Sequence, residues 1–172
     1  MDMHRHFPEW KLARFTFGDT RLSLIWLVLR VYVGLIWISA GWQKWQDPAW
    51  TGEGAGAAVS GFLHGALAKT VGEHPDVSQW YASFIEKFAL PHAVFFSYLV
   101  TYGELFVGIG LILGLFTGIA AFFGVAMNFN YLFAGTVSIN PLLILIQLPL
   151  LLAWRVAGHL GLDRYLFKKI RR

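Results

Sequence analysis

Long apolar stretches alternate with short polar breaks along most of the chain. Four of these stretches are long enough for membrane helices, at residues 22–41, 92–115, 118–134 and 141–158. A helix that crosses the bilayer core needs about 20 mostly apolar residues, with a range of about 17–25. Because a soluble core does not require several such runs, the pattern predicts an all-α integral membrane protein, built as a four-helix bundle.

The breaks between the later stretches have the composition of turns. Residues 114–118, GLFTG, form a tight turn bracketed by glycines, and residues 134–141, AGTVSINP, end in a proline that suits the first turn of a helix. Residues 42–91 make the only long connection. Within it, the glycine-rich residues 51–57 are expected to be flexible.

The long connection also contains a helical pattern over residues 77–90. Its two adjoining apolar stripes consist of Val77, Tyr81 and Ile85, and of Trp80, Phe84 and Phe88. This spacing predicts an amphipathic helix on the membrane surface, with Trp80, Phe84 and Phe88 buried against lipid or against the bundle. The alternative is a loop with incidental aromatic residues.

Lysine and arginine set the expected orientation. They cluster before the first stretch, from Arg5 onward, and in the tail that ends with Arg171 and Arg172, whereas residues 42–91 hold three lysines against five acidic residues. Cytoplasmic segments carry the excess of positive charge. We therefore expect one domain over residues 1–172, multi-pass in a prokaryotic plasma membrane, with both termini cytoplasmic. Topology and anionic lipid explain the basic tail, so no nucleic-acid partner is expected.

Composition agrees with a membrane protein and narrows the chemistry. Hydrophobic residues make up 56% of the 172 residues and charged residues 14%, against about 25% charged in soluble domains. The chain has no cysteine, which removes thiolate nucleophiles, iron–sulfur clusters and cysteine-bound zinc. No two histidines lie where they would clamp a haem at mid-depth, so we expect neither haem nor metal. Redox chemistry would then run through another cofactor or a partner subunit.

Two opposite charges lie inside the apolar stretches. Arg30 is about 12 Å into the first stretch, and Glu104 is about 16 Å from the cytoplasmic end of the second. A lone charge costs about 2.5–3.5 kcal/mol at such a depth, and a guanidinium fits a carboxylate bidentately. The sequence therefore predicts an Arg30–Glu104 pair inside the bundle, with a functional role because ion pairs stabilise poorly.

Further polar residues extend the inward faces of the helices. Arg30 shares a helix face with Trp37 and Lys44, and the third and fourth stretches contribute Asn128, Tyr131 and Gln147. Such groups also join membrane helices by hydrogen bonds of about 0.6 kcal/mol each. For Asn128 and Gln147, taken singly, that ordinary structural role is the default interpretation.

Two segments resemble a known family. LVLRVYVGLIWISAGWQKW, residues 27–45, resembles the first helix of DoxX-type membrane proteins, where an arginine, a glycine and G-x-x-K recur in that order. GELFVGIGLILGLFTGIAA, residues 103–121, is similar to the second-helix signature. The positions that match the pattern are Arg30, Lys44, Glu104 and Thr117.

The resemblance implies a four-helix membrane domain related to the membrane subunits of thiosulfate:quinone oxidoreductase, which pass electrons from a sulfur compound to quinone. Other family members are implied to be partners of soluble redox or detoxification enzymes. Partners expected for this chain are therefore membrane lipid, quinone, and another protein subunit or a second copy of the chain.

A quinone site agrees with the polar residues. A quinone head needs donors to its two carbonyl oxygens and an apolar slot. We expect Arg30 and Glu104 as catalytic residues, with Glu104 taking and releasing protons. The expected quinone-binding residues are Trp37, Lys44, Asn128, Tyr131 and Gln147, and the expected slot residues are Phe122, Phe123, Phe129 and Phe133. Two alternatives stay open: a non-catalytic assembly partner of a redox enzyme, and a small solute or lipid carrier.

Overall fold

The computed structural model describes residues 10–170, and every regular element in that range is helical. The prediction of an all-α protein is thus confirmed for the described residues. The main helices are α1 (Lys11–Gly18), α2 (Ser23–Gln46), α6 (Ala93–Leu113), α7 (Thr117–Phe133), α8 (Asn140–Leu152), α9 (Trp154–Ala157) and α10 (Asp163–Ile170). Arg5, Arg171 and Arg172, on which the expected orientation partly depends, lie outside the described residues.

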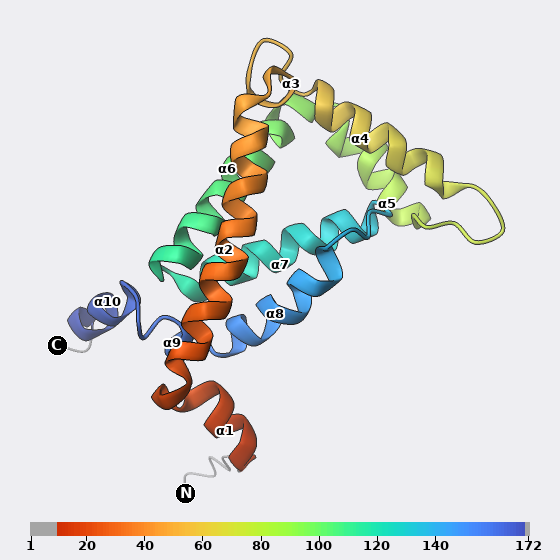
Figure 1. Cartoon of the computed structure of the whole chain (residues 1–172). Coiled ribbons are helices and arrows are strands. Elements are labelled where there is room, and N and C mark those ends of the chain that lie inside the picture. Colours follow the sequence, from red (N-terminus) through yellow and green to blue (C-terminus); the bar gives the residue numbers. More distant parts are fainter. Residues whose placement is uncertain (1–9, 171–172) are drawn as a thin grey trace, which may run out of the picture.

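Two antiparallel helix pairs make up the main body. In Figure 1, α6 runs back alongside α2, and α7 and α8 form a second pair that crosses the first. Among the described residues, two helical segments are long and apolar enough to cross a membrane, Thr20–Gln46 and Ala93–Leu113. Helices α7 and α8 are apolar but shorter, with 17 and 13 residues.

Glycines let α2 and α6 pack backbone to backbone. A Cβ placed on Gly108 would lie 2.7 Å from the backbone nitrogen of Ile38 and 2.8 Å from the carbonyl oxygen of Gly34. A Cβ on Gly34 would lie 3.0 Å from the carbonyl oxygen of Gly108. These positions have no room for a side chain, as expected where small residues allow membrane helices to approach.

The fourth apolar stretch is not one helix. Helix α8 ends at Leu152, three residues after Pro149, and α9 begins at Trp154. Proline has no backbone N–H and its ring crowds the preceding turn, so a helix seldom continues unchanged through it. The apolar stretch predicted at residues 141–158 thus contains two helices that meet at Ala153.

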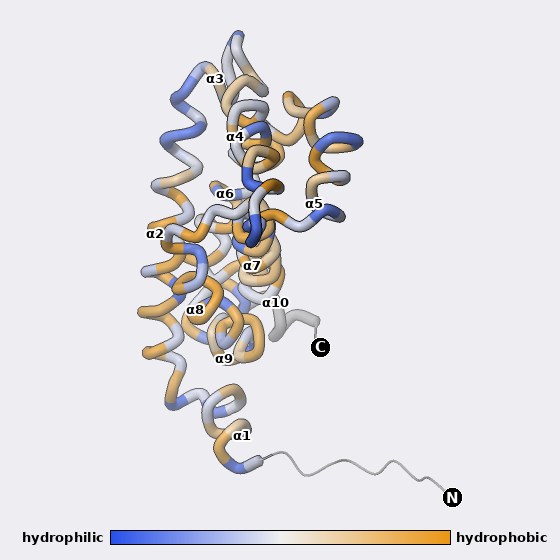
Figure 2. Tube along the Cα trace, turned by 90° about the vertical axis from the view of Figure 1, so that its right-hand side faces the viewer, coloured by the Kyte–Doolittle hydropathy of each residue, from blue (hydrophilic) through white to orange (hydrophobic). Residues whose placement is uncertain are grey.

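The long connection folds into a separate helical layer. Its elements are α3 (Pro48–Thr51), α4 (Ala57–Leu67), the 3₁₀ turn η2 (Ala68–Thr70), α5 (Gln79–Phe84) and the π-helical turn η3 (Ile85–Ala89). In Figure 2, hydrophilic residues gather at the end of α2 that leads to α3 and around α5, and hydrophobic residues dominate lower along α2, α8 and α9. We call these two regions the α3 end and the α9 end.

Part of this layer was not foreseen from the sequence. Helix α4 begins at Ala57, the last of the glycine-rich residues 51–57 that were expected to be flexible. Gly56, at φ +94°, lies against the backbone of Val94 on α6. The close approach and the left-handed backbone both require a glycine there. The glycines therefore fix a turn in the connection.

The helix predicted at residues 77–90 is present as α5 and η3, but the Val77–Tyr81–Ile85 stripe faces the core, not the stripe of Trp80, Phe84 and Phe88. Val77, Tyr81 and Ile85 are at most 5% exposed and share a hydrophobic core with Val59 and Leu63 of α4. Trp80 is 61% exposed and Phe88 49%, so these two rings are not buried against the bundle, whereas Phe84 packs partly against this core. The reason is that the apolar face of α4 packs against the Val77–Tyr81–Ile85 stripe, so this stripe is buried and the Trp80–Phe88 side faces outward. Burial of Trp80 and Phe88 against lipid stays a prediction.

Replacing Gly108 should separate α2 from α6. Gly108→Val forces its side chain into the backbone of Ile38, and overpacking of this kind costs about 1–3 kcal/mol. Gly65→Ala is the control, because nothing lies within 4 Å of a Cβ at this α4 position. Thermal unfolding in detergent should show a lower midpoint for Gly108→Val and an unchanged or higher midpoint for Gly65→Ala. Equal midpoints for both would contradict the close packing.

Tyr81 should make stability depend on pH at the alkaline end. Its hydroxyl donates to the backbone oxygen and Oδ1 of Asn130, at 3.1 and 3.2 Å, and burial raises the pKa of Tyr81 to about 12 from 10. The raised pKa stabilises the folded protein fully below pH 10, and this contribution is lost as the pH rises from 10 to 12. Tyr81→Phe should flatten that part of the stability profile, by about 1–3 kcal/mol. Tyr165→Phe, at a 70% exposed site, should retain the wild-type profile.

Candidate functional site

A cavity of about 470 Å³ lies between the two hydrophobic cores of the molecule. Helices α2, α6, α7 and α8 form one side, and α4, α5 and the turns around them form the other. Most of the lining is apolar, and its aromatic members are Trp37, Trp50, Phe62, Tyr81, Phe84, Phe96 and Tyr131. The volume is within the range of about 300–1,000 Å³ that is typical of ligand pockets.

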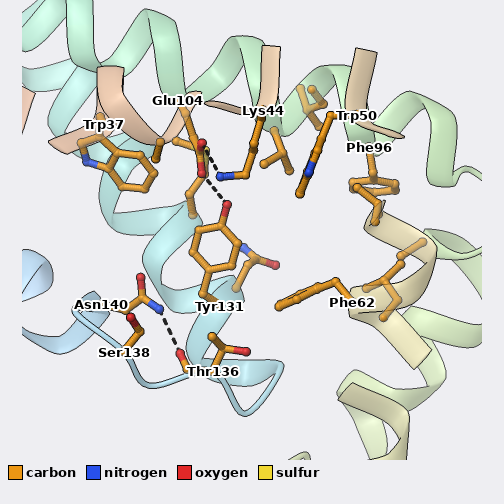
Figure 3. A pocket seen from close by; sticks show the side chains of 18 of the residues that line it. Trp37, Lys44, Trp50, Phe62, Phe96, Glu104, Tyr131, Thr136, Ser138 and Asn140 are labelled. Atoms are coloured by element: carbon orange, nitrogen blue, oxygen red, sulfur yellow. Dashed lines mark hydrogen bonds and ion pairs between the residues drawn. The ribbon is translucent and has the colours of Figure 1, made fainter. Parts of the chain in front are cut away.

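Three polar side chains meet on one wall of this cavity. The Lys44 ammonium donates to Oε2 of Glu104 at 2.7 Å, and the Tyr131 hydroxyl donates to Oε1 at 2.6 Å, as Figure 3 shows. Glu104 is only 1% exposed. We call Lys44, Glu104 and Tyr131 the polar triad. Both carboxylate oxygens are paired, so the buried charge is compensated by one cation and one phenol.

Lys44 is held in place from its other side as well. Its ammonium lies 5.1 Å from the ring centroid of Trp50, within the range of a cation–π contact. The hydroxyl of Ser97 donates to the carbonyl oxygen of Trp50 at 2.6 Å and ties α3 to α6. The ammonium is therefore positioned between a carboxylate and an indole.

Glu104 does not pair with Arg30, and that prediction is wrong. Side chains on an α-helix lean toward its amino terminus. On α2 this directs Arg30 toward the α9 end and Lys44 back down the helix. On the antiparallel α6 it directs Glu104 toward the α3 end, where it meets Lys44. The prediction compared the depths of the Arg30 and Glu104 backbones in the bilayer. It did not take into account that the two side chains point in opposite directions along the bundle.

Arg30 instead holds the turn between α6 and α7. One of its terminal nitrogens donates to the carbonyl oxygen of Leu160 at 3.1 Å, and its guanidinium lies directly against Gly114 and Gly161. A side chain at Gly114 would collide with this guanidinium. Arg30 is 1% exposed and does not line the cavity. Its neighbourhood is structural, built around a backbone turn.

Asp163 completes this second polar site and was missed in the sequence. Its carboxylate accepts from the backbone N–H of Phe116 at 2.7 Å and of Thr117 at 2.9 Å, at the start of α7. Phe116 has φ +50°, a left-handed conformation that costs energy for a bulky residue. In the sequence, the segment around Asp163 was interpreted only as a basic tail that sets the orientation in the membrane. No local pattern indicated that Asp163 contacts a turn 46 residues earlier in the chain.

Asn128 and Gln147 pair with each other, and neither lines the cavity. The Asn128 amide nitrogen donates to Oε1 of Gln147 at 2.7 Å, and both side chains are fully buried. The Gln147 amide lies against Gly124, which leaves it room between α7 and α8. The pair joins these helices, in agreement with the ordinary structural interpretation of such residues.

Trp37 lines the cavity with its ring. In Figure 3 its indole nitrogen lies on the side of the ring away from Glu104, and this nitrogen has no hydrogen-bond partner. Trp37 therefore presents an apolar surface to the cavity. Of the residues expected to bind a quinone, Trp37, Lys44 and Tyr131 come together here with Glu104.

The aromatic slot predicted on α7 is wrong. Its four phenylalanines are between 38% and 55% exposed and lie outside the cavity. They are Phe122, Phe123, Phe129 and Phe133. The side that α7 turns inward carries Ala121, Gly124 and Asn128 instead. Trp50, Phe62, Phe84 and Phe96 replace the predicted slot residues. Of these, Phe84 was noted in the sequence as part of the helix at residues 77–90, but no pattern pointed to a cavity.

The fold and this site define a class of protein: over residues 10–170 it is all-helical and membrane-compatible, with a buried ion pair that faces an aromatic cavity. A model of the DoxX family matches residues 25–136, well over half of the chain. The protein belongs to the DoxX family. The matched region contains all three residues of the polar triad. No curated protein and no solved structure matches the chain significantly.

A double-mutant cycle can separate the observed pair from the predicted one. Residues in direct contact couple by about 0.5–3 kcal/mol, whereas distant residues are additive within about 0.3–0.5 kcal/mol. The unfolding free energies of Lys44→Met, Glu104→Gln and the double variant should reveal coupling. The same cycle with Arg30→Met and Glu104→Gln should be additive. Strong coupling in the Arg30 cycle, with none in the Lys44 cycle, would restore the prediction made from sequence.

Proposed function

We propose that this protein is a quinone-binding membrane subunit of a redox system, and that the quinone head binds in the cavity beside Lys44, Glu104 and Tyr131. The single observation that carries the proposal is the polar triad on the wall of an otherwise apolar, aromatic cavity. Arg30, Asn128 and Gln147 are left out of the binding site, because none of them lines the cavity.

The charge of the cavity favours an uncharged ligand. Lys44 and Glu104 neutralise each other, and the remaining lining is mostly apolar. An anion such as thiosulfate would have to compete with Glu104 for the only lysine in the lining, and it would lose its own hydration in doing so. A quinone is neutral, planar and largely apolar, with two carbonyl oxygens that accept hydrogen bonds. It suits the cavity better than a sulfur anion.

The triad contains the protons that quinone chemistry needs. Reduction of a quinone to a quinol takes two electrons and two protons. Tyr131 and Lys44 carry protons beside the cavity, and Glu104 accepts hydrogen bonds from both. Lys44 and Tyr131 each give one proton to a quinone oxygen, and two protons taken up from water at the cavity mouth replace them, with Glu104 accepting each proton and passing it on. The electrons come from a partner, since the chain has no cysteine to carry them.

The proposal includes an orientation. The apolar helices α2, α6, α7 and α8 cross or enter the bilayer as a bundle, with both termini cytoplasmic. Support comes from the arrangement in Figure 1, where α1 and α10 lie in the lower half, away from α3 and α4. The helical layer of the long connection then covers the cavity on the extracytoplasmic side.

Quinone binding tests the proposal. The purified protein should yield quinone on lipid extraction, and a short-chain benzoquinone should quench its tryptophan fluorescence. Tyr131→Phe removes one hydrogen-bond donor and should weaken binding about 3–10-fold, the equivalent of about 0.5–1.5 kcal/mol. Tyr102→Phe is the matched control, because Tyr102 is 40% exposed and lies outside the cavity. Ala40→Phe, which fills the cavity, should abolish binding.

Other outcomes would assign the cavity differently. A folded protein that binds no quinone, or equal affinity in wild type, Tyr131→Phe and Ala40→Phe, would refute the proposal. A stable complex with a redox enzyme in the absence of quinone would then favour an assembly role. Flux of a solute or lipid in vesicles would favour a carrier.

A further inference from the structure

Two groups of polar side chains lie at different levels along the main helices. The first contains the polar triad, with Trp37, Asn128 and Gln147 next to it. Trp37 is one turn from Gly41, which packs on Glu104, and Asn128 is one turn from Tyr131. The second cluster lies at the α9 end and contains Arg30, Thr117 and Asp163.

An apolar layer separates the clusters. On α2, Val33 lies between Arg30 and Trp37, and on α6, Leu111 lies between Glu104 and the turn at Gly114. Both side chains have no exposed surface and belong to the same hydrophobic core. Arg30 and Trp37 are seven residues apart, which corresponds to about 10 Å along the helix.

Helices α7 and α8 complete this layer. Ala121 lies between Thr117 and Asn128, and Leu150 follows Gln147; both are fully buried in the same core. Residues 105–113, 118–127 and 148–153 contain no polar side chain. On α2 the one polar side chain between Arg30 and Trp37 is Tyr32, which is 46% exposed and lies outside the core. We call Val33, Leu111, Ala121 and Leu150 the apolar layer. Close-packed apolar side chains leave no site where a water molecule finds its two to four partners.

The cavity opens away from the apolar layer. Its lining includes Thr136, Ser138 and Asn140 from the turn between α7 and α8, and residues of α4 and α5. Ser138 and its neighbour Val137 are exposed. Water therefore has a route to the triad from the α3 end, through a rim of hydroxyl and amide groups.

We infer that the polar triad exchanges protons with one side of the membrane only, the side onto which the cavity opens. Along the described chain, the titratable side chains that line the cavity are Lys44 from α2, Tyr81 from α5, Glu104 from α6 and Tyr131 from α7. Arg30 and Asp163 lie beyond the apolar layer and take no part. A proton moves along hydrogen bonds, and the layer interrupts every such chain toward the α9 end.

The consequence of one-sided exchange for quinone chemistry rests on the proposed function. Each quinone reduced at the triad takes two electrons from the redox partner and two protons from the side of the cavity mouth. Each quinol oxidised there returns two protons to the same side. In the proposed orientation that side is extracytoplasmic, and the cytoplasmic proton pool is not touched.

Single cysteines can test the access, because the chain has none of its own. Three matched variants are Val100→Cys in the cavity lining, Val33→Cys in the apolar layer and Val137→Cys at the exposed rim. A small impermeant methanethiosulfonate is added to one face of sealed vesicles at a time. Val137→Cys marks the face of the cavity mouth, so the result does not depend on the orientation in the membrane.

Val100→Cys should react from the same face as Val137→Cys and not from the opposite face, and Val33→Cys should react from neither. Reaction of Val100→Cys from the opposite face, or its silence from both faces, would overturn the inference. Reaction of Val33→Cys at a rate comparable to that of Val100→Cys would do so too. Denaturation in detergent should then expose every cysteine, which controls for reactivity.

A second measurement separates this inference from the proposed function. The affinity of wild-type proteoliposomes for the short-chain benzoquinone is measured while the pH is changed on one face only. The affinity should respond to pH on the face that Val137→Cys marks, and equal responses on both faces would contradict one-sided exchange. Absence of quinone binding together with one-sided labelling would defeat the proposed function and leave the one-sided access standing.

Discussion

The carboxylate of Glu104 is the constraint on which much of the interior depends. It is 1% exposed and surrounded by apolar side chains, so its charge has to be compensated within the protein. Lys44 from α2 and Tyr131 from α7 supply that compensation, and their hydrogen bonds fix the relative positions of three helices. Removing either charge of such a pair costs about 3–5 kcal/mol, because the other is left unpaired. Stability alone does not require the arrangement, since apolar residues of similar size pack as well.

The cavity follows from the way in which the long connection folds. Helices α4 and α5 build a hydrophobic core of their own around Tyr81 and Ile85 instead of filling the space above the main helices. Aromatic rings line the space between the two cores, and among them Phe62 and Tyr131 meet edge to face with their ring centroids 6.0 Å apart. Large rigid rings cannot fill an irregular gap completely. A space therefore remains where the two cores face each other, and the triad borders it.

The sequence predicted the helices much better than it predicted their contacts. Long apolar runs identify α2 and α6 directly. The partner of Glu104 was not predictable from depth alone, because a long side chain on a helix reaches about one turn toward the amino terminus. Asp163 and α4 were missed for another reason. Their roles depend on partners distant in the chain, and no local pattern encodes such partners.

The residues shared with the family pattern divide into two physical units. Lys44 and Glu104 belong to the triad, whereas Arg30 and Thr117 belong to the turn that Asp163 closes. The turn fixes where α6 ends and α7 begins, and so sets the register in which Glu104 on α6 meets Tyr131 on α7. Arg30 thus contributes to the site through the geometry of a turn, some 15 Å along α6 from the carboxylate that it was expected to bind. A buried arginine within an apolar run can either bind a ligand or hold a backbone turn in place. The sequence looks the same in both cases, and only the three-dimensional arrangement distinguishes them.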